Sequence, residues 1–121
     1  MAYIQSFKEL IVWQKGIQLV KVIYIATRKL PREETYGLTS QMRRAAVSIP
    51  SNIAEGKKRK TKKDFLQFLR VANGSAAELE TQIIITTDLY QEVDFTVASS
   101  LLTEVQKMLA TIIAKLETSK S

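Results

Sequence analysis

Apolar residues recur at alternating spacings of three and four in four segments of this 121-residue chain, and this recurrence constrains the fold most strongly. The third segment is the most regular; its stripe is Phe65, Leu69, Ala72, Ala76, Leu79, Ile83, Thr86 and Tyr90. An α-helix brings such positions onto one face, and no strand-like alternation extends over a useful length. The pattern predicts an all-α fold with one domain over residues 1–121, an antiparallel up-down four-helix bundle.

Capping and helix-breaking residues mark the ends of the four predicted helices. In chain order these signals are the S-x-x-E pair Ser6 and Glu9, Pro31, Gly56, the capping pair Thr61 and Asp64, and either Asp94 or Thr96. Pro50 falls inside the second helix. A proline there removes a backbone hydrogen bond and clashes with the preceding turn, so we predict that this helix is kinked at Pro50.

The first and fourth predicted helices each carry two adjacent apolar stripes. On the first helix, one stripe contains Trp13 and Tyr24, which we expect in the core. The stripe beside it is Val12, Leu19, Ile23, Ala26 and Leu30. Two stripes fit either a thick core or a second face that packs against another subunit. The subunit interpretation predicts that glutamate at Ile23 or Ile113 gives soluble monomers.

The net charge of +6 is unevenly distributed along the chain. Residues 1–63 carry 14 Lys and Arg against 4 Asp and Glu, a net +10, whereas residues 64–121 carry 4 against 8, a net −4. Such an asymmetry indicates a basic face and an acidic face on one small body. It suits a nucleic-acid ligand and equally suits self-association between opposite faces.

The densest charge follows Gly56, where six of seven consecutive positions are basic: Lys57, Lys58, Arg59, Lys60, Lys62 and Lys63. Like charges this close repel one another, and a polyanion relieves the repulsion. Arg43 is a candidate to extend this nucleic-acid-binding patch. The simpler alternative is a solvated turn that favours solubility. Because no aromatic residue lies within the run, any nucleic acid should bind through phosphate and shape.

A polar stripe is predicted along the edge of the core, joining the second and third helices. Its members are Arg44, Ser48, Asn52, Glu55, Ser75 and Glu78. We interpret it as a structural polar seam, with an ion pair between Arg44 and Glu78 that fixes register, and with Glu55 paired to Arg59 at the i,i+4 spacing. An active site built on Glu55 and Glu78 is the weaker alternative.

The chain contains no cysteine and no histidine. Disulfides, thiolate chemistry, the usual base near neutral pH and the commonest metal ligand are therefore excluded. We expect no enzyme activity, no catalytic residue, no cofactor and no metal. The N-terminus lacks the pattern of a signal peptide, and no segment approaches the roughly 20 apolar residues of a membrane span. A cytoplasmic protein without membrane contact is expected.

Residues 41–82 resemble the signature of the bacterial four-helix bundle family, the 23S rRNA intervening-sequence proteins. That signature runs Q-x-R-R-A-x-x-S-[IV]-x-x-N-I-A-E-G, then a basic turn, then F-L-x-x-A-x-G-S-x-x-E-x-x-T. The matching residues are Gln41, Arg43, Arg44, Ala45, Ser48, Ile49, Asn52, Ile53, Ala54, Glu55, Gly56, Phe65, Ala72, Gly74, Ser75, Glu78 and Thr81. The opening FKELIVWQKGIQLV is similar to the family's first helix. Asn73 departs from the family, which often has Arg or Lys there.

The resemblance implies a four-helix bundle and a cyclic homopentamer. The fold is similar to that of the accessory protein of diversity-generating retroelements, which works with a reverse transcriptase and its RNA. We therefore predict a non-enzymatic oligomeric adaptor that binds structured RNA or other nucleic acid through the basic turn between the second and third helices. The alternative is an oligomeric scaffold for a protein partner, such as a reverse transcriptase, with no nucleic-acid ligand.

Overall fold

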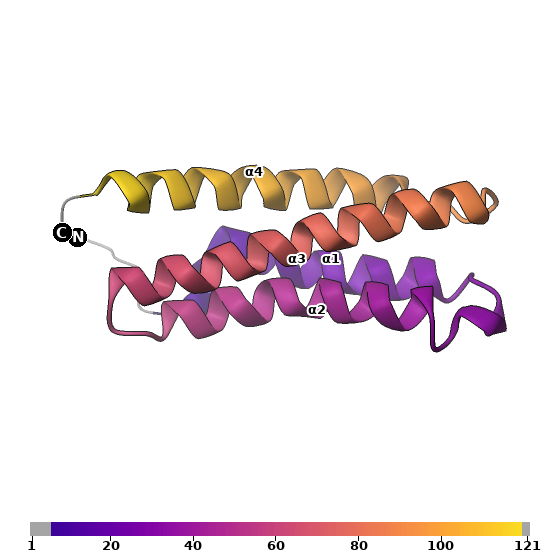
Figure 1. The fold of residues 1–121 in the computed structure, drawn as a ribbon, viewed down its shortest axis with the longest axis horizontal. Coiled ribbons are helices and arrows are strands. Elements are labelled where there is room, and N and C mark those ends of the chain that lie inside the picture. The colour runs from indigo at the N-terminus through magenta and orange to yellow at the C-terminus, as the bar shows by residue number, and fades with distance from the viewer. Residues whose placement is uncertain (1–5, 120–121) are drawn as a thin grey trace.

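The computed structural model describes residues 6–119, and the helices in this range confirm the predicted all-α four-helix class. The four α-helices are α1 (Ile11–Thr27), α2 (Leu38–Lys57), α3 (Lys62–Leu89) and α4 (Thr96–Thr118). Two short 3-10 helices, η1 (Phe7–Glu9) and η2 (Arg32–Glu34), precede α1 and α2. Figure 1 shows the chain reversing direction at each connection between successive α-helices.

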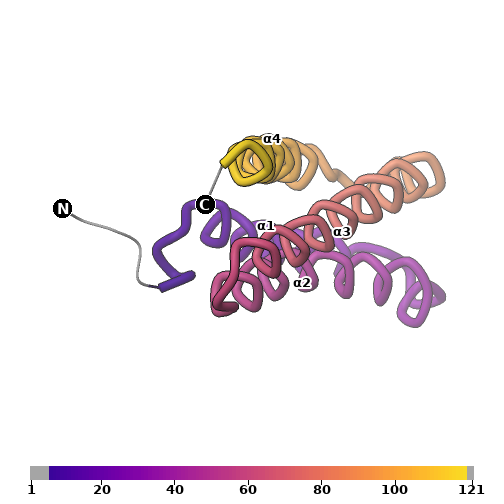
Figure 2. The backbone as a smooth tube through the Cα atoms, turned by 60° about the vertical axis from the view of Figure 1, so that its left-hand side comes forward, coloured from indigo at the N-terminus to yellow at the C-terminus, as the bar shows by residue number. Residues whose placement is uncertain are grey.

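Each helix contacts two neighbours around the bundle. α2 and α3 share the most extensive contact, and α1 and α4 close the arrangement by packing on each other and on α2 and α3 respectively. Within residues 6–119 the diagonal pairs, α1 with α3 and α2 with α4, bring no two Cα atoms within 8 Å of each other. Figure 2 shows α4 lying across from α2, with α1 and α3 between them. The core therefore forms along the central axis of the bundle.

On α1, the stripe that could have faced another subunit is buried in the core of the single chain. Val12, Leu19 and Ile23 are buried within the single chain, with Ile23 fully inaccessible. Of the two aromatics expected in the core, Trp13 packs against it and is partly buried, whereas Tyr24 is partly buried outside the core cluster. The interpretation of the Ile23 stripe as an intersubunit face is therefore wrong for α1, because α2 and α4 already cover that side.

On α4 the two stripes share the core. Val105 belongs to the predicted stripe of Leu101, Met108, Ile112 and Leu116, and Leu102 and Leu109 belong to the stripe beside it with Ile113. All three are buried. Ile112 and Ile113 are partly buried and pack against the edge of the core. A helix packed between two neighbours buries a face wider than one heptad seam, which explains why both stripes contribute.

The predicted caps are found at the starts of α3 and α4, but the cap predicted for α1 belongs to η1. Thr61 caps α3 as predicted, since its hydroxyl accepts a hydrogen bond from the Asp64 amide. The Asp94 carboxylate accepts from the Thr96 amide at 2.8 Å at the start of α4. The Ser6 hydroxyl, in contrast, caps η1 by accepting from the Lys8 amide, and α1 begins only at Ile11. The predicted capping box therefore opens a 3-10 turn, because the extended backbone at Leu10 separates this turn from α1.

Two small-residue contacts set how closely α2 approaches its neighbours. Gly16 of α1 faces Pro50, and a Cβ at Gly16 would lie 3.3 Å from the Pro50 Cβ. α2 ends at Lys57, which confirms the predicted end near Gly56, and Gly56 itself is buried and helical. Its role is close packing, because a Cβ there would lie 2.7 Å from the Phe68 Cβ. α2 stays helical through Pro50, and the kink itself stays a prediction.

A hydrogen bond between Tyr90 and Glu34 ties the end of α3 to the connection before α2. The Tyr90 hydroxyl donates to the Glu34 carboxylate at 2.6 Å, and the other carboxylate oxygen accepts from the Leu38 amide at 3.1 Å. The bond to Tyr90, and next the bond to Leu38, lower the pKa of Glu34. The bond to Glu34 raises the pKa of Tyr90 to about 12.

These pKa shifts predict a pH dependence that Tyr90→Phe should remove. A raised folded-state pKa at Tyr90 stabilises the fold below pH 10.0, and this contribution is lost as pH rises toward about 12. The lowered pKa of Glu34 stabilises above 4.5 and is lost as pH falls through its folded value. We expect the melting temperature of wild type to exceed that of Tyr90→Phe at pH 7 and the gap to close by pH 12. A constant gap between pH 7 and 12 contradicts this assignment.

Candidate nucleic-acid interface

The basic run forms the turn between α2 and α3, at one end of the bundle (Figure 1). α2 ends at Lys57, Lys58 caps it, and α3 begins at Lys62. The last α2 carbonyls favour nearby cations, whereas the first turn of α3 carries a partial positive charge. Lys62 and Lys63 therefore lie where the helix dipole favours an anion over a cation.

Three of the six basic side chains in this turn are held by contacts within the chain. The Lys57 ammonium lies over the Phe65 ring, 5.7 Å from its centroid. Arg59 donates to the Glu55 carboxylate at 3.0 Å, as predicted, and its guanidinium lies 4.8 Å from the centroid of Phe68. These contacts fix the direction of both cations and cover the two aromatic faces.

Lys62 is held from the far end of the chain. Its ammonium donates to the Ser119 carbonyl at 2.6 Å, which joins the start of α3 to the end of α4. Arg70 makes a second bridge to α4 through the Glu117 carboxylate, at 2.5 Å. Neither contact follows from the spacing of residues along a helix, because the partners lie 57 and 47 residues away.

Lys58, Lys60 and Lys63 remain exposed, and among residues 6–119 none of the three has a hydrogen-bond, ion-pair or ring partner. Their ammonium groups stand beside three further cations that are held in place. The repulsion among them is not offset by carboxylates, apart from Glu55 on Arg59 and Asp64 in the first turn of α3. This turn therefore offers three lysines that can bind phosphate without breaking an internal contact.

Arg43 does not extend this surface. It lies 14 positions before Lys57 on the same helix, which separates the two by about 20 Å. Its Nε donates to the Thr27 hydroxyl at 3.0 Å, a terminal nitrogen donates to the Tyr24 carbonyl at 3.3 Å, and its guanidinium lies 4.3 Å from the Tyr24 ring centroid. Arg43 thus satisfies a carbonyl near the end of α1, a position that helix electrostatics favours for a cation.

The predicted polar seam is present at its centre. Ser48 and Ser75 share a hydrogen bond of 2.8 Å between α2 and α3. The Asn52 amide donates to the Ser48 carbonyl at 2.8 Å and to the Ser48 hydroxyl at 3.0 Å. These three side chains form a continuous network in a partly buried contact.

The ends of the seam differ from the expectation. Arg44 and Glu78 are both exposed, and no ion pair joins them among the described residues. Glu78 instead accepts from the Gln82 amide at 3.4 Å, and Arg44 lines an open depression beside Tyr36. The predicted ion pair between Arg44 and Glu78 is therefore wrong. The Ser48–Ser75 bond sets the register of α2 against α3, and Arg44 lies on the outer side of α2.

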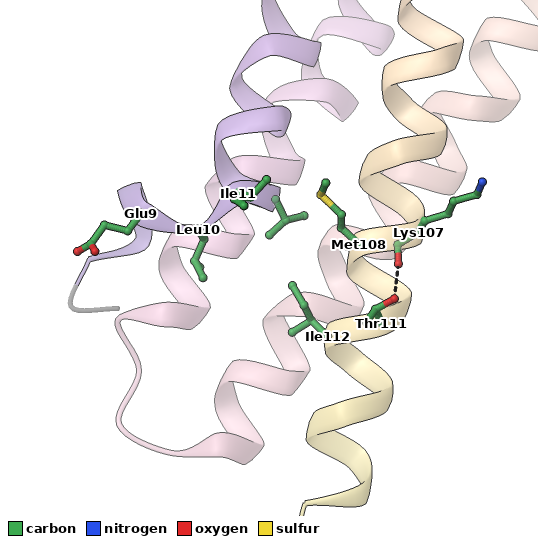
Figure 3. A pocket seen from close by; sticks show the side chains of 8 residues that line it. Glu9, Leu10, Ile11, Lys107, Met108, Thr111 and Ile112 are labelled. Atoms are coloured by element: carbon green, nitrogen blue, oxygen red, sulfur yellow. Dashed lines mark hydrogen bonds between the residues drawn. The ribbon is translucent and has the colours of Figure 1, made fainter. Parts of the chain in front are cut away.

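An apolar hollow of ≈ 470 Å³ lies between the start of α1 and the second half of α4 (Figure 3). The lining residues are Glu9, Leu10, Ile11, Val12, Lys107, Met108, Thr111 and Ile112. Figure 3 shows the charged groups of Glu9 and Lys107 extending away from the hollow, while Leu10, Met108 and Ile112 face it. This surface suits an apolar partner better than a nucleic acid.

Over residues 6–119, one helix is long and apolar enough to cross a membrane, judged by length and composition alone. This helix is α4, with a mean hydropathy of 1.2 and 22% of its most apolar window buried. The core helix of a soluble protein passes the same test, so the observation is weak evidence for a membrane. It does show that much of α4 is uncovered in the single chain.

The described residues contain no group of three or more Asp, Glu, His or Cys placed to hold a metal ion. The fold and the surface define a class: a small, basic, all-α bundle whose densest run of cations lies at one turn between helices.

The chain belongs to the 23S rRNA-intervening sequence protein family, whose sequence model matches residues 8–111. Its fold is similar to the crystal structure of a protein of unknown function from the S23 ribosomal protein family of Bacteroides thetaiotaomicron VPI-5482. The two structures align with a TM-score of 0.73 over 85% of this chain and 98% of that chain, at 22% sequence identity. At this identity the likeness shows the fold. No curated protein matches the chain.

Proposed function

We propose that the protein is a non-enzymatic oligomeric adaptor that binds structured RNA, or another nucleic acid, through the α2–α3 turn. The observation that supports this most directly is that only three of the six cations in the turn are engaged by internal contacts. Lys57, Arg59 and Lys62 are held by internal contacts, and Lys58, Lys60 and Lys63 point to solvent without partners in the described range. A turn that is already ordered loses little conformational entropy when phosphates bind.

The turn should read phosphate and shape rather than bases. Its aromatic neighbours, Phe65 and Phe68, are partly buried and have Lys57 and Arg59 over their rings. Because each ring is partly buried and has a cation over one face, it is a poor platform for base stacking. We therefore propose a double-stranded or folded ligand with weak sequence preference, for which RNA and DNA duplexes compete almost equally.

Self-association, as a homopentamer, is part of this proposal. The apolar hollow beside α4 and the low burial of α4 support a contact between copies. Five copies in a ring would place about 15 exposed lysines on one rim and raise the local potential several-fold. The same apolar surface supports the second candidate, a scaffold that meets a protein partner such as a reverse transcriptase, with the basic turn serving solubility.

Changing Lys58, Lys60 and Lys63 together to Gln should abolish binding of a labelled RNA hairpin. With three phosphate contacts in each bound copy, wild-type affinity should fall about 40-fold between 50 and 200 mM salt, and this dependence should disappear in the variant. Fluorescence anisotropy at the two salt concentrations measures both effects. The melting temperature should not change, because these side chains are exposed.

The matched control changes Lys15, Lys29 and Arg32 to Gln, which removes the same charge from α1 and the α1–α2 connection, away from both the turn and the apolar hollow. It should bind the hairpin nearly as well as wild type. Absence of wild-type binding at 50 mM salt, or equal losses in the two triple variants, would reject the nucleic-acid site and favour the protein scaffold.

A further inference from the structure

The opposite end of α2 carries a second basic surface, and this one includes aromatic rings. Figure 1 shows the α1–α2 connection at the far end of the bundle from the α2–α3 turn. Tyr36 lies in this connection and Lys58 caps the other end of α2, 22 positions later, a separation of about 30 Å. The two surfaces cannot therefore be one patch.

Tyr36 is the most exposed large hydrophobic residue in the described part of the chain, at 95% exposure. The backbone that presents it is nonetheless fixed. The Gly37 amide donates to the Glu34 carbonyl at 3.0 Å, the Leu38 amide donates to the Glu34 carboxylate, and the Thr35 hydroxyl donates to the Arg32 carbonyl at 2.7 Å. An ordered turn thus holds an aromatic ring in solvent, with both faces open.

A second ring lies beside it in a rigid pair. Arg43 stacks on Tyr24 at 4.3 Å, and its hydrogen bonds to Thr27 and to the Tyr24 carbonyl lock the guanidinium plane. Tyr24, Tyr36, Arg43 and Arg44 line one open depression of ≈ 440 Å³, together with Thr35, Thr39, Ser40 and Val47. This combination supplies a stacking surface, hydrogen-bond donors and cations within one concave site.

The cations continue along α1. A second depression of ≈ 510 Å³ shares Tyr24 with the first and is lined by Lys21 and Arg28. These two residues are seven positions apart, or two helical turns and about 10 Å. Within residues 6–119, Arg44, Arg28 and Lys21 make no ion pair. Of the nearby carboxylates, Glu34 is engaged by Tyr90 and Leu38, whereas Glu33 and Glu92, which both help to raise the pKa of Tyr90, are exposed without such bonds.

We infer that this surface binds single-stranded nucleic acid, with a base stacked on Tyr36 and with Arg44, Arg28 and Lys21 on the phosphates. Stacking on a free ring requires an unpaired base, which a duplex does not present. A line of cations longer than one phosphate suits a strand better than an isolated anion. The inference goes beyond the proposed function, because it uses a different end of the bundle and a different form of ligand.

Tyr36→Ala should weaken binding of a short unstructured labelled RNA about 5- to 150-fold, because one base–aromatic stack is lost. Tyr36→Phe keeps the ring and should bind like wild type. Arg44→Gln should lower the slope of log affinity against log salt by about one. Anisotropy measures all three, and Tyr36→Ala should melt like wild type because the side chain contributes no burial.

Testing each variant with both the RNA hairpin and the short unstructured RNA separates this site from the α2–α3 turn. Tyr36→Ala should not alter hairpin binding, whereas the Lys58, Lys60 and Lys63 triple variant should. Equal single-strand affinity for Tyr36→Ala and wild type overturns the inference and leaves the turn proposal standing. Equal losses in Tyr36→Ala and Tyr36→Phe overturn the stacking role. A changed mass by light scattering in Tyr36→Ala, with unchanged single-strand binding, overturns it in favour of a contact between copies.

Discussion

Ile23→Glu is expected to unfold the protein rather than release folded monomers. Ile23 lies on α1 and is fully buried against the neighbouring helices. The substitution removes a packed aliphatic side chain and buries a carboxyl group with no partner, which together cost about 5 kcal/mol or more. This cost is comparable to the whole stability of a small domain. Circular dichroism at neutral pH should show loss of most of the helical signal.

Ile25→Glu is the matched control, two positions further along α1. Ile25 is 56% exposed, so the same change there should alter the free energy of unfolding by less than about 0.5 kcal/mol. A folded Ile23→Glu protein with a reduced mass in solution would restore the interpretation of this stripe as an intersubunit face.

Gly56→Ala should lower the free energy of unfolding by about 1–3 kcal/mol, although alanine is the better helix former. The added methyl would lie 2.7 Å from the Phe68 Cβ and 3.1 Å from the Phe65 ring. The Phe68 Cβ is attached directly to the α3 backbone, so relief requires α2 and α3 to separate. Urea unfolding measures the change.

Gly74→Ala provides the opposite expectation on the same helix pair. Gly74 is exposed in the middle of α3, and nothing lies within 4 Å of a Cβ built there. Alanine should therefore stabilise the protein by about 1 kcal/mol through helix propensity alone. If both alanine variants are stabilised alike, then α2 and α3 do not approach as closely at Gly56 as described.

The contact at Gly56 also shapes the proposed interface. It lets Phe65 and Phe68 lie under Lys57 and Arg59, where their rings hold two cations in place. A loosened α2–α3 end should leave these cations less ordered and weaken hairpin binding, even though no lysine is changed. This effect can be measured as the hairpin affinity of Gly56→Ala, with Gly74→Ala as the control. The hairpin affinity of Gly74→Ala should equal that of wild type.

Local patterns in the sequence predict the helices and the short-range contacts within them. Apolar spacing, the Thr61 cap and the Glu55–Arg59 pair depend on residues within one or two turns of each other, where geometry follows from the helix alone. The long motif at residues 41–82 was also sufficient to identify the family, which the match over residues 8–111 shows.

Tertiary structure alone decided which of two adjacent stripes on α1 faces the core and which cations of the basic turn stay free. Ile23 and Trp13 lie on neighbouring sides of one helix, and only the positions of α2 and α4 decide which side is covered. Lys62 reaches Ser119, and Arg43 reaches α1 instead of the turn. The periodicity of a helix places residues on a face, but it carries no information about which distant element covers that face.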